Sequence, residues 1–184
     1  MTRLFVICLL GLGALAAACG APASGGSETA ADALNRGLQA HAAGKLDDAI
    51  AAYFATLSKD PKNQFAYYNL GEIAQRQNRL VTADGFYRLA LDLDPKMESA
   101  LFNLAIVRTN LGQTADAVSL YKQVIGVNPN SAAAHFNLGL LFRQLGQTAD
   151  AQTELATAQR LDPKLVAPNP TATPNQQATP TRKP

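Results

Sequence analysis

The chain of 184 residues is 47% hydrophobic and 16% charged, a size and composition that allow one domain with a core and two flexible ends but no second folded domain. The formal net charge is +2, but residues 30–164 contain 13 basic and 13 acidic side chains and are therefore neutral. Because nucleic-acid binding needs a basic stripe, this charge balance argues against a nucleic-acid partner.

Residues 1–18 have the pattern of a signal peptide. Arg3 supplies the positive start, an apolar run follows from Leu4 to Leu12, and small residues lead up to Cys19. The apolar run is shorter than the ~20 residues that span a bilayer. The other cysteine, Cys8, lies within this segment, so the processed chain forms no internal disulfide.

The string Leu15-Ala16-Ala17-Ala18-Cys19 resembles the lipobox of bacterial lipoproteins, although Ala16 stands where a lipobox most often has leucine. The resemblance implies that Cys19 is lipidated and begins the mature chain. Gly20 in the next place implies the outer membrane in an organism with two membranes, and otherwise the outer face of the cytoplasmic membrane. The alternative is cleavage at an ordinary Ala-x-Ala site, which predicts a secreted protein with a free thiol at Cys19.

Residues 19–29 are rich in Gly, Ala and Ser and predict a flexible tether. After them, the stretch from Gln64 to Pro95 has the pattern of a complete helical hairpin. Apolar or small residues recur at helical spacing in both of its halves, and Pro95 ends the unit because proline cannot continue a helix. The residues with this spacing are Tyr67, Leu70, Gly71 and Ala74 in the first half, and Ala83, Tyr87, Ala90 and Leu91 in the second.

The hairpin pattern recurs every 34 residues. This step joins the prolines Pro61, Pro95, Pro129 and Pro163, the alanines Ala49, Ala83, Ala117 and Ala151, and the tyrosines Tyr53, Tyr87 and Tyr121. A helix-turn-helix period of 34 residues is the signature of the tetratricopeptide repeat, and the chain resembles that family from about Ala30 to Pro163. The resemblance implies an all-α, right-handed solenoid of four repeats with eight antiparallel helices, placed at residues 30–164.

The ends of the individual helices are also predicted. Gly44, Asn78, Gly112 and Gly146 recur between the two helices of each repeat, where a residue that tolerates positive φ closes the first helix. Thr114 and Thr148 then predict N-caps for the second helices of the last two repeats. In the final helix the polar residues Gln152, Glu154 and Gln159 replace apolar ones, which predicts a polar cap where a further repeat would pack.

Residues 165–184 change in composition and predict a disordered tail rich in Pro and Thr. Half of the ten prolines lie here, together with Arg182 and Lys183 and no acidic residue. Such a segment cannot form a core. A spacer is the favoured interpretation of the tail, and a docking segment is the alternative.

Catalytic candidates are sparse. His135 occupies the fourth place of its repeat, where packing is expected, and His41 lies near a helix end, where exposure to solvent is expected. No cluster of His, Cys, Asp or Glu has the spacing of metal ligands, so we expect no enzyme activity, cofactor or metal.

A column of asparagines is the most specific pattern in the chain. The 34-residue step joins Asn35, Asn69, Asn103 and Asn137, and directly before them lie Leu34, Tyr68, Phe102 and Phe136. The resemblance places these residues on the concave surface of the solenoid, with Leu38, Ile106 and Leu140 one turn further and Glu72 as an exception. A side-chain amide both donates and accepts hydrogen bonds, so it suits a peptide backbone of any sequence. The predicted peptide-binding residues are Asn35, Asn69, Asn103, Asn137, Tyr68, Phe102, Phe136, Ile106 and Leu140.

These patterns together predict a non-catalytic adaptor held at the cell envelope by a lipid on Cys19. Its expected partner is an extended segment of another envelope protein, as in outer-membrane, pilus or cell-wall assembly. The alternative is a structural protein that self-assembles through the ends of its repeat stack. The sequence leaves the oligomeric state open.

Overall fold

The computed structural model of the chain describes residues 28–166, and this part consists of eight α-helices without strands. The predicted signal peptide, Cys19, nearly all of the tether and the tail beyond Val166 lie outside the described residues. The helices are α1 Ala30–Ala42, α2 Leu46–Lys59, α3 Gln64–Arg76, α4 Leu80–Leu93, α5 Glu98–Asn110, α6 Thr114–Val127, α7 Ala132–Gln144 and α8 Thr148–Leu161.

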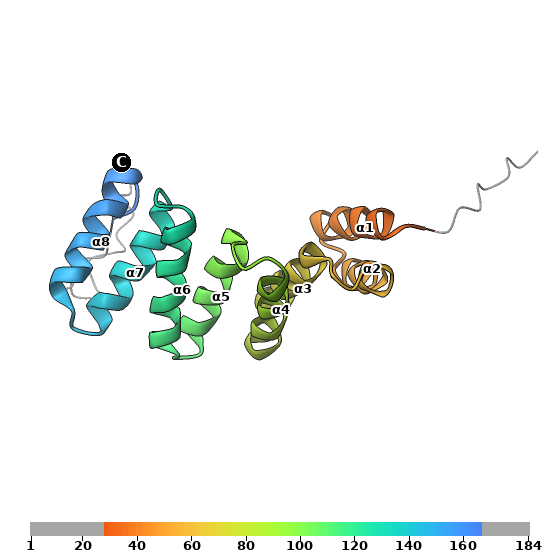
Figure 1. Ribbon diagram of the computed structural model, residues 1–184, viewed down its shortest axis with the longest axis horizontal. Helices are drawn as coiled ribbons and strands as arrows, with labels where there is room; N and C mark the ends of the chain where they lie inside the picture. Colours follow the sequence, from red (N-terminus) through yellow and green to blue (C-terminus); the bar gives the residue numbers. More distant parts are fainter. Residues whose placement is uncertain (1–27, 167–184) are drawn as a thin grey trace, which may run out of the picture.

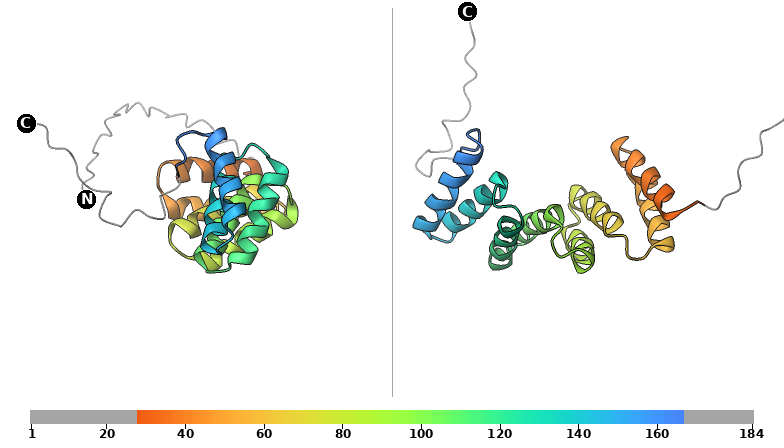
Figure 2. Two further views of the ribbon diagram at one scale, coloured as in Figure 1. Left: turned by 90° about the vertical axis from the view of Figure 1, so that its left-hand side faces the viewer. Right: turned by 45° about the horizontal axis from the view of Figure 1, so that its top comes forward.

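The helices form four hairpins that stack in chain order. Within each hairpin an odd-numbered helix packs against the even-numbered helix that follows, and α2–α3, α4–α5 and α6–α7 contacts join the hairpins. Figure 1 shows the resulting elongated stack, with α1 and α8 at opposite ends, and Figure 2 shows that it winds about its long axis. The all-α solenoid of four repeats that the sequence predicts is therefore confirmed.

A tyrosine in each of the first three even-numbered helices explains why the repeats need a small residue opposite. Tyr53 and Tyr87 are completely buried, and their rings lie over Gly37 and Gly71 of the preceding helix. A Cβ atom at Gly71 would lie 2.6 Å from the ring of Tyr87, too close for any side chain. The Tyr87 hydroxyl donates a hydrogen bond of 2.7 Å to Gln75, so the buried polar group is satisfied.

The turns inside the hairpins confirm one prediction about the helix ends and correct another. Gly44 has φ of 74° and Asn78 has φ of 57°, the left-handed conformation expected there. However, Thr114 and Thr148 are the first residues of α6 and α8, and the cap positions are occupied by glutamines whose side chains form no capping bond. The prediction of threonine caps was wrong because only one residue separates the left-handed turn residue from each helix.

The polar cap predicted on α8 is present only in part. Gln152 and Gln159 are exposed and line a hollow of about 330 Å³ at the far end of the stack. Glu154 instead points into its own repeat, where Oε2 lies 2.6 Å from Nδ1 of His135. The prediction that Glu154 faces outward was therefore wrong, because a histidine on α7 lies opposite.

Candidate functional site

The odd-numbered helices line the inner side of the superhelix. Besides the helices directly before and after it in the chain, α3 also contacts α5. Between these two helices, the amide nitrogen of Asn103 donates a hydrogen bond of 3.2 Å to the hydroxyl of Tyr68. Each odd-numbered helix begins at the first residue of its 34-residue repeat, so equal repeat positions occupy equal places on α1, α3, α5 and α7. We call the surface formed by repeat positions five, six and nine of these helices the groove.

The asparagine column contributes to the groove but also holds the fold together. Asn69 is only 8% exposed, and its amide nitrogen donates a hydrogen bond of 2.7 Å to the carbonyl of Phe65 on the same helix. The amide nitrogen of Asn103 is used by Tyr68, as described above. The side chains of Asn35 and Asn137 form no hydrogen bond to another described residue. In the two middle repeats, one of the two amide donors is therefore already used, and a ligand would meet the amide oxygen and the remaining donor.

Apolar side chains from all four odd-numbered helices form a stripe beside the asparagines. The ring of Phe102 packs edge-on against the buried Tyr121, with 5.7 Å between centroids, and the ring of Tyr68 lies 5.9 Å from that of Tyr87. These core contacts fix the rings in place while leaving them partly exposed. The partly buried or exposed members of the stripe are Leu34, Leu38, Tyr68, Phe102, Ile106, Phe136 and Leu140.

A polar hollow of about 300 Å³ interrupts the apolar stripe in the middle of the groove. Glu72, Gln75, Arg76 and Asn103 line it. The repeat pattern marks Glu72 only as an exception and does not indicate Gln75 or Arg76, although their positions one turn after Glu72 place them on the same face of the helix.

Glu72 places a negative charge in the hollow, which Arg76 also lines. Its carboxylate forms neither an ion pair nor a hydrogen bond within residues 28–166. Burial, and then the charge of Glu72, raises the pKa of Tyr53 to about 12 and also raises the pKa of Tyr87. The charge therefore acts on side chains from two neighbouring repeats.

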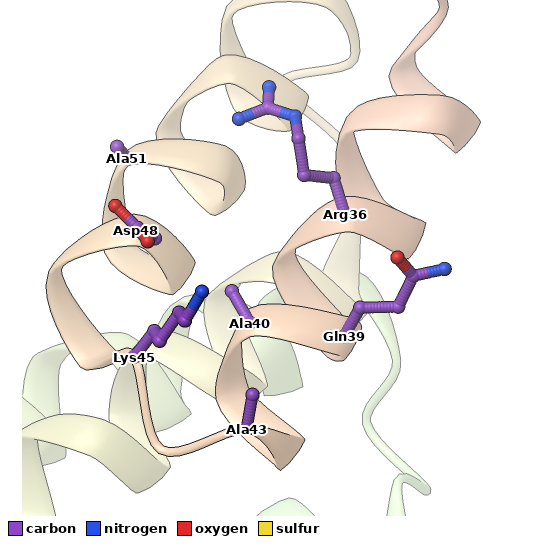
Figure 3. A pocket seen from close by; sticks show the side chains of 7 residues that line it. All are labelled: Arg36, Gln39, Ala40, Ala43, Lys45, Asp48 and Ala51. Carbon is purple, nitrogen blue, oxygen red and sulfur yellow. The ribbon is translucent and has the colours of Figure 1, made fainter.

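The beginning of the stack has a second hollow, of about 440 Å³. Figure 3 shows Arg36, Lys45 and Asp48 around a floor of small side chains. In the second repeat, the residues at the equivalent positions also line a hollow. There, Ile50 and Phe54 of the preceding helix, α2, line it with them. The hollow therefore corresponds to the surface that, one repeat later, faces the preceding helix. Arg36, which stands where the later repeats have leucine, forms an ion pair with Glu28 at 2.8 Å.

The two histidines are held by structural contacts. His135 is buried, with Nδ1 close to Glu154 and Nε2 lying 3.1 Å from the carbonyl of Pro129. His41 packs edge-on against Tyr53, and its Nε2 atom is buried without a partner, so the prediction that this side chain is exposed was wrong. Within residues 28–166, no group of side chains is arranged to hold a metal ion, and no helix is both long and apolar enough to cross a membrane.

Together, the stacked hairpins and the groove define an α-helical repeat scaffold. The family model of the tetratricopeptide repeat matches residues 34–98 and 102–165, and the chain belongs to this family. Proteins of this family are generally non-catalytic adaptors that bind other proteins. None of the curated proteins compared with the chain matches it.

Solved structures share the fold. A crystal structure of MamA is 22% identical, covering 74% of this chain and 80% of MamA, with a TM-score of 0.70. A tetratricopeptide repeat protein from Parabacteroides merdae is 28% identical, covering 73% of this chain and 54% of its own, with a TM-score of 0.68. A structure of MamA from Desulfovibrio magneticus, from residue 41 to its end, is 14% identical. The match covers 75% of this chain and 78% of that one, with a TM-score of 0.67.

Proposed function

We propose that this protein is a lipid-anchored adaptor that holds an extended segment of another envelope protein in its groove. The observation that supports this proposal most strongly is the alignment of partly exposed apolar side chains on four successive inner helices. Rings such as Phe102 are fixed by core contacts, so little conformational entropy is lost when a ligand covers them. The amide oxygens beside them are available to accept hydrogen bonds from the ligand's backbone.

The groove is tested by replacing Phe136 and Asn137 together with alanine. The side chain of Asn137 has no hydrogen bond within the described residues, so its loss removes a contact to the ligand rather than to the fold. One hydrogen bond of ~1 kcal/mol and part of an aromatic contact of ~1 kcal/mol predict at least tenfold weaker binding. The measurement is photo-crosslinking in intact membranes from a reactive residue at Leu140, with the captured protein identified by mass spectrometry.

A reactive residue at Val81 is the matched control, because this side chain lies on α4, outside the groove, and is 77% exposed. We expect a defined protein product from position 140 that the double substitution removes, and no such product from position 81. Equal products from both positions, or a product that survives the double substitution at full strength, would contradict groove binding.

The lipid anchor is tested at Cys19. Because a diacylated cysteine supplies the apolar chains that hold a lipoprotein on a membrane, Cys19→Ala should move the protein from the membrane fraction to the soluble fraction. Mass analysis of the mature wild-type chain should show a lipid on this residue. An unmodified Cys19 would instead support a secreted protein. With the anchor, the proposed site of action is the outer membrane, or the outer face of the cytoplasmic membrane where that is the single membrane.

Self-assembly through the stack ends is less well supported by the geometry. At the first junction between repeats, Ile50 and Phe54 of α2 line a hollow together with side chains of the next repeat. The last helix has Gln152 and Ala156 in those two places, so it offers no matching apolar side chains to the hollow at the beginning of a second copy.

A further inference from the structure

Three charged residues that replace apolar or small ones in this repeat are paired inside the protein. Arg36 pairs with Glu28, Arg108 with Asp84, and His135 with Glu154. Glu72, which stands where the other repeats have Leu38, Ile106 and Leu140, forms no such ion pair among residues 28–166, although Arg76 lines the same hollow. A partly buried carboxylate without an ion pair gains stability from a cation, so this hollow can accept a cationic group from outside the described helices.

Residues 167–184 of the same chain have the composition that suits the groove. They contain five prolines, no acidic residue, and the cations Arg182 and Lys183. Proline-rich segments favour the extended polyproline II conformation, whose backbone has no internal hydrogen bonds, and such segments dock in grooves lined by aromatic rings. Phe102, Phe136 and Tyr68 supply rings at one per repeat along the stripe.

We propose that residues 167–184 bind in the groove of their own chain, with prolines against Phe136 and Phe102 and with Arg182 or Lys183 at Glu72. This proposal rests on the groove of the proposed function and assigns it an internal occupant. The tail then competes with a partner's segment for the same groove.

The length of the tail is sufficient for this path. Arg182 is sixteen residues beyond Val166, which corresponds to about 50 Å at ~3.1 Å per residue in polyproline II. From α8 back to α3 there are five steps between neighbouring helices, about 40 to 50 Å at 8–10 Å each. Because the tail is tethered, its effective concentration at the groove is in the millimolar range, so even a weak contact is populated.

The test is paramagnetic broadening in the chain from Gly20 onward, which keeps every described residue and the tail and contains no native cysteine. Ala178→Cys carries a spin label, and methyl signals are compared with the label oxidised and reduced. We expect the signals of Ile106 and Leu140 in the groove to lose at least half of their intensity. The signals of Val81 and Leu89, exposed on α4, should keep theirs.

Glu72→Gln is the matched variant, since it removes the charge and keeps the shape of the side chain. It should restore the Ile106 signal at least twofold, and full broadening in this variant would overturn the contact between the tail and Glu72. Equal broadening of groove and control signals would overturn tail binding altogether. Broadening seen only when labelled chains are mixed with unlabelled, isotope-enriched chains would also overturn it and indicate a second copy.

No partner is present in this measurement. A negative result therefore removes the tail as occupant without affecting the proposed adaptor function. Conversely, a failure of the crosslinking from Leu140 would leave tail binding to be judged by the broadening alone.

Discussion

Replacing Arg108 with alanine is expected to destabilise the fold by about 3 to 5 kcal/mol, because it leaves a largely buried carboxylate without its partner. Arg108 on α5 forms two hydrogen bonds to Asp84 on α4, one of them 3.0 Å from Nη2 to Oδ2. A third, of 2.9 Å, reaches Asp116 on α6. The side chains of Arg108 and Asp84 are only 19% and 15% exposed, so solvent screens this pair little.

The other junctions of the same chain supply the control variant. At the junction before the last repeat, the places of Asp84 and Arg108 are taken by Val118 and Phe142. The double variant Asp84→Val with Arg108→Phe therefore reproduces a pair that already packs in this fold. We expect its stability to lie within about 1.5 kcal/mol of the wild type or above it, since a packed apolar pair often replaces a buried ion pair without loss.

The measurement is urea unfolding of the single and double variants, followed by circular dichroism. The expected order of destabilisation is Arg108→Ala first, then Asp84→Val, in which Arg108 keeps Asp116, and last the double variant. A loss below about 1 kcal/mol for Arg108→Ala is typical of exposed ion pairs and would contradict the structural role of this one. A double variant as unstable as the sum of the two single changes would show that the two sites do not interact.

The features that the sequence predicts correctly depend on spacing along the chain. The 34-residue step places Tyr87 opposite Gly71 and gives Asn78 the left-handed turn, because both relations are set within one hairpin. The step also places the asparagines in one column. It does not reveal that the amide nitrogen of Asn103 is used by Tyr68, since that depends on how closely α3 and α5 approach.

The features that the sequence analysis misses are departures from the repeat that compensate one another. Arg108 is the charged residue in a place otherwise held by alanine or phenylalanine, and Asp84 is the charged residue in a place otherwise held by isoleucine, valine or glutamine. His135 and Glu154 are a second such pair. Comparing the repeats place by place and matching their charged exceptions would have indicated both pairs before the structure.

The pair of His135 and Glu154 provides the last prediction, for the final repeat. Replacing His135 with leucine should cost about 1 to 3 kcal/mol, because Glu154 and the carbonyl of Pro129 both lose their ring partner. In the preceding repeat the same two places hold Leu101 and Leu120, which belong to the packed core. The double variant His135→Leu with Glu154→Leu should therefore recover most of the lost stability.

Hydrogen exchange shows where this effect acts. Since a repeat array opens most easily from its ends, we expect faster exchange in α7 and α8 of the single variant, with α1 to α4 unchanged. Gln152→Leu, an exposed change on the same helix, should stay within about 0.5 kcal/mol of the wild type and serves as the control. A single variant as stable as this control would mean that the contact between His135 and Glu154 contributes nothing to the end of the stack, and that packing of α8 on α7 through Ala151 and Leu155 is sufficient.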